Sequence, residues 1–363
     1  MRTVVIGGHG NFGARICGAL AGDEGIEILA AGRRRAAPHP AGVEAVTLDI
    51  ASPRFPDELA ALRPGVVIHC AGPFQDQDYA VASAAIAANA HYIDLADGRR
   101  FVSNFSAALD GAARAAGVLA VSGASTLPAL SSAVIDGIAA RFPSVRGIWI
   151  AIAPGQRAPR GAATITGVLS YAGRSFQWLS GGRWSDAWGW QELMRVSFAG
   201  AGVRWAAACD VPDLELLPAR YAGTRTVEFR AALELGIQHF GLWLAAALRR
   251  AGVPVPLERW AGRLDRLASL LDRFGSDRGG MLVSVAVERE NGSRALIEWH
   301  LTAEASHGPE IPCMAAILLA RKLARGELGQ RGAFPCMGLI SLDEFESEFK
   351  RWRISTLIRE SPI

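Results

Sequence analysis

The glycines of one short N-terminal segment have the spacing of a turn that binds dinucleotide phosphates. Residues 7–13 read GGHGNFG, and they follow the β-branched run Val4-Val5-Ile6. In the pattern G-x-G-x-x-G, the first glycine allows a tight turn, the second lets the backbone approach a pyrophosphate, and the third lets helix and strand pack closely. The N–H groups at the start of the next helix would then bind the phosphates. The residues predicted to form this site are Gly8, His9, Gly10, Asn11, Phe12 and Gly13.

Basic residues after the second predicted strand favour a phosphorylated cofactor. Arg33, Arg34 and Arg35 follow the apolar run 26–31, at the position where NAD sites usually carry an acidic residue for the ribose 2′-hydroxyl. Arginine suits a 2′-phosphate instead, so we predict NADP(H), bound by Arg33 and Arg34. Two alternatives stay open: a solvated basic turn, and a domain of this shape that binds no cofactor.

Strand and helix patterns alternate along the first 125 residues. This alternation predicts a doubly wound parallel sheet of the Rossmann type. The strands are expected at 4–6, 26–31, 43–48, 66–70, 91–95 and 118–121, and helices at 78–90 and 104–116.

The pattern changes after residue 127. Apolar and alternating runs predict strands at 147–153, 226–230, 281–288 and 295–303, with helices near 130–140, 236–250, 257–273, 315–325 and 342–352. The fold class is therefore α/β, with an N-terminal Rossmann sheet, a second mixed-sheet α/β domain and a C-terminal helical return. The expected domains are residues 1–127 with 307–335 for the dinucleotide, 128–306 for substrate or dimerisation, and a helical tail at 336–363.

Further candidate residues follow the predicted strands of the first domain. Ligands bind at the carboxyl ends of the strands in such sheets. Asp49 follows the third strand and the segment Ala71-Gly72-Pro73 follows the fourth, so these residues are expected beside the cofactor.

Hydride transfer belongs to the cofactor, but the protein must supply a proton donor or acceptor near the substrate. The candidate catalytic residues are Asp97, Tyr79 and His307, with Asp94 and His300 as further titratable groups. Structural roles compete with each assignment. Asp97 could cap the following helix, Asp94 could be a buried partner of backbone or of an arginine, Tyr79 could pack in the core, and His307 could be structural.

Five tryptophans gather between residues 171 and 205, with three arginines nearby. Aromatic rings and guanidinium groups could bind a carboxylated, partly apolar substrate. They could equally cover the second sheet or form a dimer contact, which is the reading we favour. The residues are Trp178, Trp184, Trp188, Trp190 and Trp205, with Arg183, Arg195 and Arg204.

Composition excludes several classes of partner. The 363-residue chain has a net charge of only +3, so nucleic acid is not indicated. Its five cysteines are scattered without a C-x-x-C pair, which indicates neither a zinc site nor a disulfide framework and fits a reducing cytoplasm. No metal-ligand spacing is present. The apolar run 240–248 is too short to span a membrane, although Arg249 and Arg250 after it leave interfacial contact as an alternative.

Several segments give the chain a family resemblance. GGHGNFG at 7–13, HCAGPFQDQDYAVASAAIAANAHYIDLADGRRF at 69–101 and SGASTLPALSSAVID at 122–136 resemble the saccharopine dehydrogenase-like family, and the segments at 204–221 and 274–281 are similar to its less characterised bacterial members. The resemblance implies an NADP-dependent oxidoreductase that acts on C–N bonds of amino-acid-like compounds. It also implies a second α/β domain, inserted before the chain returns to the first.

The favoured hypothesis is an NADP(H)-dependent oxidoreductase for a small imine or amino-acid-like substrate, assembled as a homodimer. A non-catalytic NADP(H)-binding sensor or scaffold is one alternative. An oxidoreductase for a lipid-like substrate at a membrane surface, suggested by the helix at 236–250, is another.

Overall fold

The chain folds into two compact units. A computed structural model describes residues 1–34 and 40–363. The first unit comprises Met1–Leu130 and Glu310–Ile340, and the second comprises Ser131–Pro309 and Ser341–Ile363. Each unit is therefore built from two separate stretches of the chain.

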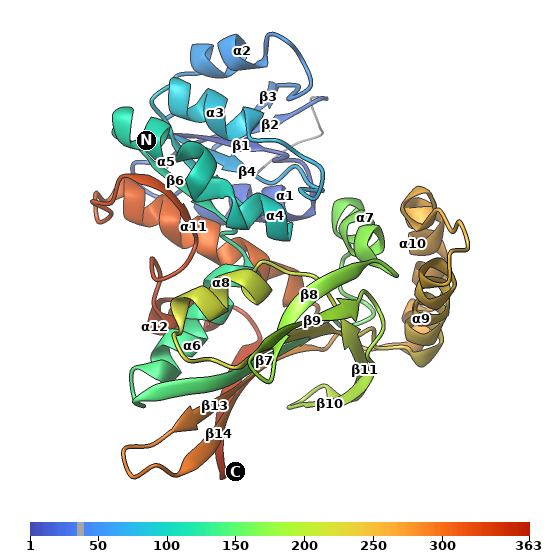
Figure 1. Cartoon of the computed structure of the whole chain (residues 1–363). Coiled ribbons are helices and arrows are strands. Elements are labelled where there is room, and N and C mark those ends of the chain that lie inside the picture. The colour runs from blue at the N-terminus through green and yellow to red at the C-terminus, as the bar shows by residue number, and fades with distance from the viewer. Residues whose placement is uncertain (35–39) are drawn as a thin grey trace. The chain divides into compact units, whose positions relative to one another are not determined.

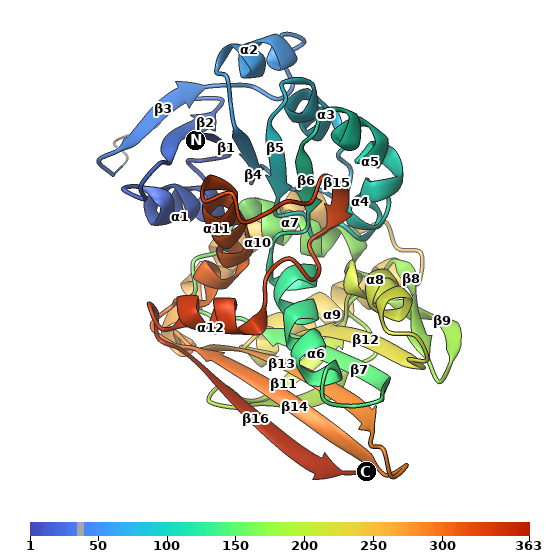
Figure 2. The same cartoon turned by 90° about the vertical axis from the view of Figure 1, so that its left-hand side faces the viewer.

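The first unit contains a parallel sheet of seven strands, in the order β15-β6-β5-β4-β1-β2-β3 (Figure 2). Its central strands are β-branched and fully buried, as expected for a sheet that helices cover on both faces. The predicted Rossmann sheet is confirmed. The strands are β1 (Arg2–Ile6), β2 (Glu27–Gly32), β3 (Val43–Thr47), β4 (Val66–His69), β5 (His91–Asp94), β6 (Leu119–Ser122) and β15 (Gly332–Pro335).

The helices of the first unit follow the strands, except for one that arrives from far along the chain. This helix, α11, packs against α1 (Figure 1), and Arg321 on it pairs with Asp23 at 2.7 Å. The predicted return of the chain is thereby confirmed. The helices are α1 (Asn11–Leu20), α2 (Phe55–Ala61), α3 (Ala80–Ala87), α4 (Arg99–Ser103), α5 (Phe105–Ala115), η1 (Thr126–Leu130) and α11 (Ile311–Ala324).

The second unit is built on a mixed sheet, as the sequence predicts. Its path runs β10-β11-β12-β7-β13-β14-β16, and the hairpin β8–β9 pairs with β12. Among the strand pairs described for this sheet, β12 and β7 are parallel and the others are antiparallel. Strands β13, β14 and β16 lie side by side as long strands (Figure 2). The strands are β7 (Ser144–Ala153), β8 (Ser175–Ser180), β9 (Arg183–Trp188), β10 (Met194–Phe198), β11 (Gly202–Ala208), β12 (Thr226–Ala231), β13 (Gly279–Glu288), β14 (Arg294–Ala303) and β16 (Ile354–Pro362).

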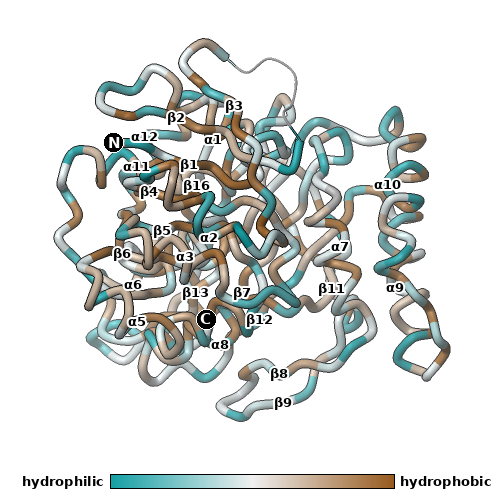
Figure 3. Tube along the Cα trace, turned by 90° about the horizontal axis from the view of Figure 1, so that it is seen from above, coloured by the Kyte–Doolittle hydropathy of each residue, from teal (hydrophilic) through white to brown (hydrophobic). Residues whose placement is uncertain are grey.

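Helices of the second unit cover the sheet or extend from it. Helix α6 contacts β7 and β13, while α9 and α10 lie at one edge of this unit (Figures 1 and 3). The remaining elements are short. The helices are α6 (Ser131–Ala139), α7 (Ala162–Tyr171), α8 (Asp213–Arg220), α9 (Gly236–Arg250), η2 (Leu257–Trp260), α10 (Ala261–Leu270), η3 (Asp272–Phe274) and α12 (Leu342–Phe349).

The C-terminal segment differs in part from the expected helical tail. It contains helix α12, but it ends in the strand β16, which pairs with β14 along nine residues. After Ile354 every residue of β16 is exposed. An edge strand exposed on both faces needs no alternation of apolar and polar side chains, so the sequence carried no strand signal there.

Candidate cofactor-binding site

The glycine turn follows β1 and bends at Gly7. This residue has φ +79°, a conformation that favours glycine, so the tight bend predicted for Gly8 lies one residue earlier. The Gly7 N–H donates to the carbonyl of Ala31 at 2.9 Å. At Gly8 the need for glycine is steric, because a Cβ would lie 2.8 Å from Ala30 Cα on the adjacent strand. The turn is thus held against β2.

The third glycine brings helix α1 onto the turn. A Cβ at Gly13 would lie 2.2 Å from the carbonyl oxygen of Gly7, a backbone atom that cannot move away. Gly10 is the N-cap of α1 with extended backbone, and no side chain caps this helix end. The first N–H groups of a helix have no intrahelical partner. The end of α1 is consequently suited to the pyrophosphate of a dinucleotide.

Polar contacts anchor the first turn of α1 to helix α11. Arg15 donates from Nη1 to both the carbonyl and Oδ1 of Asn11, each at 2.7 Å, and from Nε to Glu310 at 2.8 Å. Cys313 Sγ lies 3.6 Å from the carbonyl oxygen of Phe12. The backbone of Asn11, through Arg15, and that of Phe12 are thereby linked to residues about 300 positions away in sequence.

The basic segment after β2 is exposed beside His9. The side chains of Arg33 and Arg34 are both exposed, whereas Arg35 lies outside the described residues. A Cβ at Gly32 would lie 2.6 Å from His9 Cδ2, so the imidazole packs against the end of β2. Two guanidinium groups are therefore free to reach a phosphate beside the turn.

The next two strand ends contain the other residues predicted to contact the cofactor. Asp49, after β3, is half-buried and accepts the N–H of Ala51 at 3.1 Å, which forms a local turn. After β4, Gln77 Nε2 donates to the carbonyls of Ala71 at 2.7 Å and Pro73 at 2.8 Å.

The loop after β4 also meets the glycine turn. A Cβ at Gly7 would lie 3.0 Å from the backbone nitrogen of Ala71, so these two loops are in contact. Gly72, between Ala71 and Pro73, is half-buried. The loop from 71 to 73 therefore has a defined shape at the edge where ligands bind in such sheets.

A fully buried carboxylate connects the ends of β5 and β6. Asp94 Oδ1 accepts hydrogen bonds from the N–H of Ala96 at 2.9 Å, the N–H of Gly123 at 2.8 Å and Oγ of Ser122 at 3.0 Å. Burial raises the pKa of Asp94 to about 6, against the opposing effect of these hydrogen bonds. The sequence interpretation of Asp94 as a possible partner of backbone is confirmed.

Two buried residues that sequence reasoning missed lie next to this carboxylate. His69 Nδ1 and the hydroxyl of Tyr92 are 3.0 Å apart, and His69 packs edge-on against Phe74. Burial lowers the pKa of His69 to about 4 and raises that of Tyr92, whose pKa the nearby Asp94 raises further. The runs VVIH and HYID offered a weak signal, because each places a polar group at a strand end.

Asp97 and Tyr79 both lie in the first unit, but their functional groups differ in access. Asp97 is exposed and accepts a hydrogen bond from Gln75 Nε2 at 3.1 Å. It does not cap the following helix, whose N-cap is Gly98. The Tyr79 hydroxyl donates to the carbonyl of Phe101 at 2.8 Å, and its ring packs against that residue. This geometry gives Tyr79 a packing role.

The third candidate, His307, belongs to the second unit. Its Nδ1 accepts the N–H of Arg353 at 3.0 Å, and its ring packs edge-on against Trp352. His300 is also part of this unit and is 3% exposed, with Nδ1 3.4 Å from the N–H of Ala199. Each histidine therefore holds backbone in place.

The tryptophan-rich stretch forms the hairpin β8–β9, the strand pair β10–β11 and the loops between them. Trp178 and Trp190 are buried, while Trp184 and Trp205 are exposed. Trp188 lies under the guanidinium of Arg250, 4.7 Å from its ring centre. Most of these rings therefore pack within the second unit.

The three arginines of this stretch divide in the same way. Arg204 is buried and donates to the carbonyls of Pro154 at 2.8 Å and Arg278 at 3.0 Å. Arg183 and Arg195 are exposed. Arg195 lines an open groove of about 430 Å³ on the second sheet, whose other lining residues include Trp149, Met194, Arg230 and Glu298.

Two kinds of site are not found in the described part of the chain. No group of three or more His, Cys, Asp or Glu side chains among those residues could hold a metal ion. None of the helices in this part combines the length and apolar character needed to cross a membrane.

Comparison with known proteins agrees with the geometry of the first unit. Residues 3–121 match the family model described as the saccharopine dehydrogenase NADP binding domain. This segment contains the glycine turn and the basic residues after β2. The predicted family resemblance and the predicted NADP-binding domain are confirmed. No curated protein matches the sequence.

Three solved structures share the fold along nearly the whole chain. Apo saccharopine dehydrogenase (L-Glu forming) from Saccharomyces cerevisiae has a TM-score of 0.67 at 13% identity, covering 99% of each chain. Homospermidine synthase from Legionella pneumophila, in complex with NAD, has a TM-score of 0.62 at 10% identity, covering 99% of this chain and 91% of that one. DAP dehydrogenase of C. glutamicum, in complex with DAP, has a TM-score of 0.51 at 15% identity, covering 96% and 98%. Similarity at such low identity shows the fold.

Proposed function

We propose that this protein is an NADP(H)-dependent oxidoreductase, because residues 3–121 match the model of the saccharopine dehydrogenase NADP binding domain. Its substrate would be an imine or an amino-acid-like compound with a reactive C–N bond. The observation that carries the proposal is the glycine turn, with an uncapped helix end on one side and two exposed arginines on the other. The fold shared with two dehydrogenases supports the redox assignment.

Each part of the first unit has a distinct role in this proposal. The N–H groups of α1 bind the pyrophosphate, and Arg33 and Arg34 bind the 2′-phosphate. The loop from 71 to 73 orients the reactive end of the cofactor, which supplies the hydride. Asp97, an exposed residue after β5 whose pKa is raised by desolvation of its carboxyl group, exchanges the proton that accompanies reduction of the imine.

Cofactor binding tests the first half of the proposal. NADPH binding is measured by its fluorescence for the wild-type protein and for Gly10→Leu, in which a bulky side chain occupies the helix end. The matched control is Gly111→Leu, because a side chain there meets no atom within 4 Å. We expect binding to be lost only in Gly10→Leu. Undiminished NADPH binding by that variant would exclude the proposed site.

Turnover separates an enzyme from a cofactor-binding sensor or scaffold. Two of the three candidate catalytic residues, Tyr79 and His307, make structural contacts, and this favours the sensor alternative. Asp97 is the exposed candidate of the three. NADPH oxidation is followed with a panel of amines paired with keto acids. Turnover that decreases in Asp97→Asn, at unchanged NADPH affinity, supports the enzyme. Tight NADPH binding without turnover of any pair supports the sensor.

A further inference from the structure

Helix α9 of the second unit exposes the apolar stripe that such a helix normally buries. Ile237, Phe240, Leu244 and Leu248 recur at helical spacing, and their exposed fractions lie between 40% and 74%. Among the residues of α9, only His239 and Ala246 are buried. The outward side of this helix therefore carries large apolar side chains, which an ordinary surface helix directs toward the core.

The following segment continues this apolar surface with aromatic and aliphatic side chains. On α10 and η3, the side chains of Leu267, Leu270 and Phe274 are 59%, 71% and 63% exposed, and Trp260 before them is 38% exposed. Gln238 of α9 donates to the carbonyl of Ala268 on α10 at 3.4 Å, so the two helices are neighbours. Figures 1 and 3 show both at the same edge of the second unit. We call the exposed side chains of residues 236–275 the α9–α10 face.

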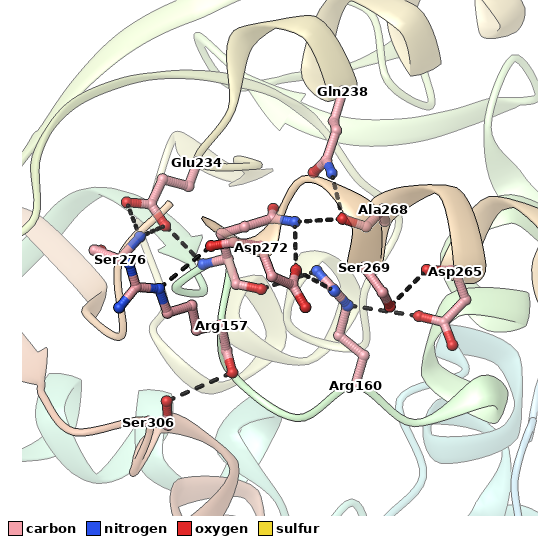
Figure 4. A network of polar contacts seen from close by, with 11 residues as sticks. Arg157, Arg160, Glu234, Gln238, Asp265, Ala268, Ser269, Asp272, Ser276 and Ser306 are labelled. Atoms are coloured by element: carbon pink, nitrogen blue, oxygen red, sulfur yellow. Dashed lines mark hydrogen bonds and ion pairs between the residues drawn. The ribbon is translucent and has the colours of Figure 1, made fainter. Parts of the chain in front are cut away.

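The charges of this segment are arranged so that positive charge faces outward. Residues 236–275 contain six arginines and three acidic residues. Each acidic residue pairs with an arginine: Asp265 and Asp272 share Arg160, at 3.5 Å and 2.7 Å, as Figure 4 shows, and Glu258 pairs with Arg249 at 2.8 Å.

Besides Arg250, which lies over the ring of Trp188, four arginines of the same segment have no acidic partner among the described residues. Arg259, Arg263, Arg266 and Arg273 are exposed, and none of them forms an ion pair with a residue that the structure describes. Arg273 instead lies over the ring of the exposed Phe274, 4.6 Å from its centre. The α9–α10 face thus carries apolar side chains together with uncompensated positive charge.

We propose that the α9–α10 face docks on a membrane surface that contains anionic lipid. An amphipathic helix with arginines beside exposed apolar residues can lie in the interfacial plane, with its side chains among the headgroups. A tryptophan such as Trp260 suits that depth. Helix α9 has 15 residues and is about 22 Å long, less than the ~30 Å of the hydrocarbon core, so it lies along the surface.

Charge distinguishes this occupant from a second copy of the chain. In a two-fold symmetric dimer the same patch faces itself, and the four arginines would then be brought toward their own copies without acidic partners. Anionic headgroups neutralise them instead, and each arginine near such a surface strengthens binding about fivefold. This proposal does not depend on the reaction that the first unit supports.

Vesicle flotation with the full-length protein tests the proposal. We expect binding to vesicles of phosphatidylcholine mixed with phosphatidylglycerol, and weak binding to phosphatidylcholine alone. Leu267→Glu with Leu270→Glu should abolish binding. Reversal of Arg259, Arg263 and Arg266 to Glu should weaken it at least about a hundredfold, because three favourable charges are lost.

Matched variants control for general changes in polarity and charge. Leu357→Glu with Ile363→Glu alters two exposed apolar residues elsewhere in the unit, and the exposed Arg54, Arg141 and Arg183 changed to Glu give the same net charge as the test variant. Both controls should bind vesicles like the wild type. Circular dichroism checks that every variant is folded.

Three results would overturn the proposal. The first is that the wild type does not bind anionic vesicles. The second is that vesicle binding decreases equally in the test and control variants. The third is that the wild type does not float but sediments as a dimer, which the Leu267 and Leu270 changes dissociate.

Discussion

Replacing the buried carboxylate Asp94 by Asn should change how the stability of the protein depends on pH. Asp94 is fully buried, and burial raises its pKa from 3.8 to about 6 even though its Oδ1 accepts three hydrogen bonds. The folded state therefore prefers the neutral carboxyl group. Asn keeps a neutral oxygen acceptor for the same donors but cannot ionise.

The direction of the effect follows from the raised pKa. Below about pH 4 the group is protonated in both folded and unfolded chains, and its favourable contribution is complete. As pH rises through 6 that contribution is lost, because the unfolded chain ionises freely and the folded chain does not. Each pKa unit corresponds to about 1.4 kcal/mol, so the ionised carboxylate costs about 3 kcal/mol at pH 8.

Urea unfolding of the wild type and Asp94→Asn between pH 4 and pH 8 measures this cost. The free energy of unfolding of the variant, minus that of the wild type, should rise by about 2.5 kcal/mol over the range, because the unfolded chain is already partly ionised at pH 4. His69 acts in the opposite direction, since its pKa, lowered by burial to about 4, reduces stability as pH falls below 6.5. Taking the difference between the two proteins removes that contribution. A difference that stays constant with pH would refute the reasoning, and Asp76→Asn, at an exposed carboxylate, is the control.

Other contacts lead to three further predictions. Gly13→Ala places a Cβ 2.2 Å from the Gly7 carbonyl oxygen, and should lower stability by about 1–3 kcal/mol and weaken NADPH binding; thermal unfolding and NADPH titration should show both losses, with Gly111→Ala unaffected. Arg33→Asp should weaken NADPH far more than NADH, because only NADPH carries the 2′-phosphate; equal losses in two titrations would contradict that role. Arg160→Met leaves Asp265 and Asp272 unpaired, so amide exchange in α10 should accelerate while exchange in β1 stays unchanged.

The glycine turn was predictable because its requirements are local. Gly8 and Gly13 are fixed by backbone atoms at most six residues away or on the adjacent strand, and the spacing of the motif encodes those contacts. The sequence placed the bend at Gly8 because the motif begins there, whereas the positive φ belongs to Gly7. The alternation of strands and helices in the first unit could also be predicted, because it follows from the pattern of apolar residues within short segments.

Other features depend on contacts between distant parts of the chain. Strand β15 extends the parallel sheet only by pairing with β6, more than 200 residues earlier, and its four residues have no alternation that marks a strand. His69 and Tyr92 meet because β4 and β5 are neighbours. The polar group at the end of each short segment was only a weak signal, and it did not indicate that a histidine and a tyrosine would be buried together.

The fold fixes the residue types at the phosphate end of the proposed site more strictly than at the strand ends of β4 and β5. At the phosphate end, a side chain at Gly8 or Gly13 would collide with backbone, so the need for glycine follows from geometry alone. At the strand ends of β4 and β5, the side chains of His69, Tyr92 and Asp94 are buried. His69 Nδ1 contacts the Tyr92 hydroxyl and Asp94 Oδ1 accepts backbone N–H groups, while His69 Nε2 and Asp94 Oδ2 have no hydrogen-bond partner among the described residues. Such groups can hold loops in shape, but they cannot exchange protons with a substrate at the surface. In the proposed enzyme, proton transfer must then come from an exposed group such as Asp97, and the turnover of Asp97→Asn tests that role.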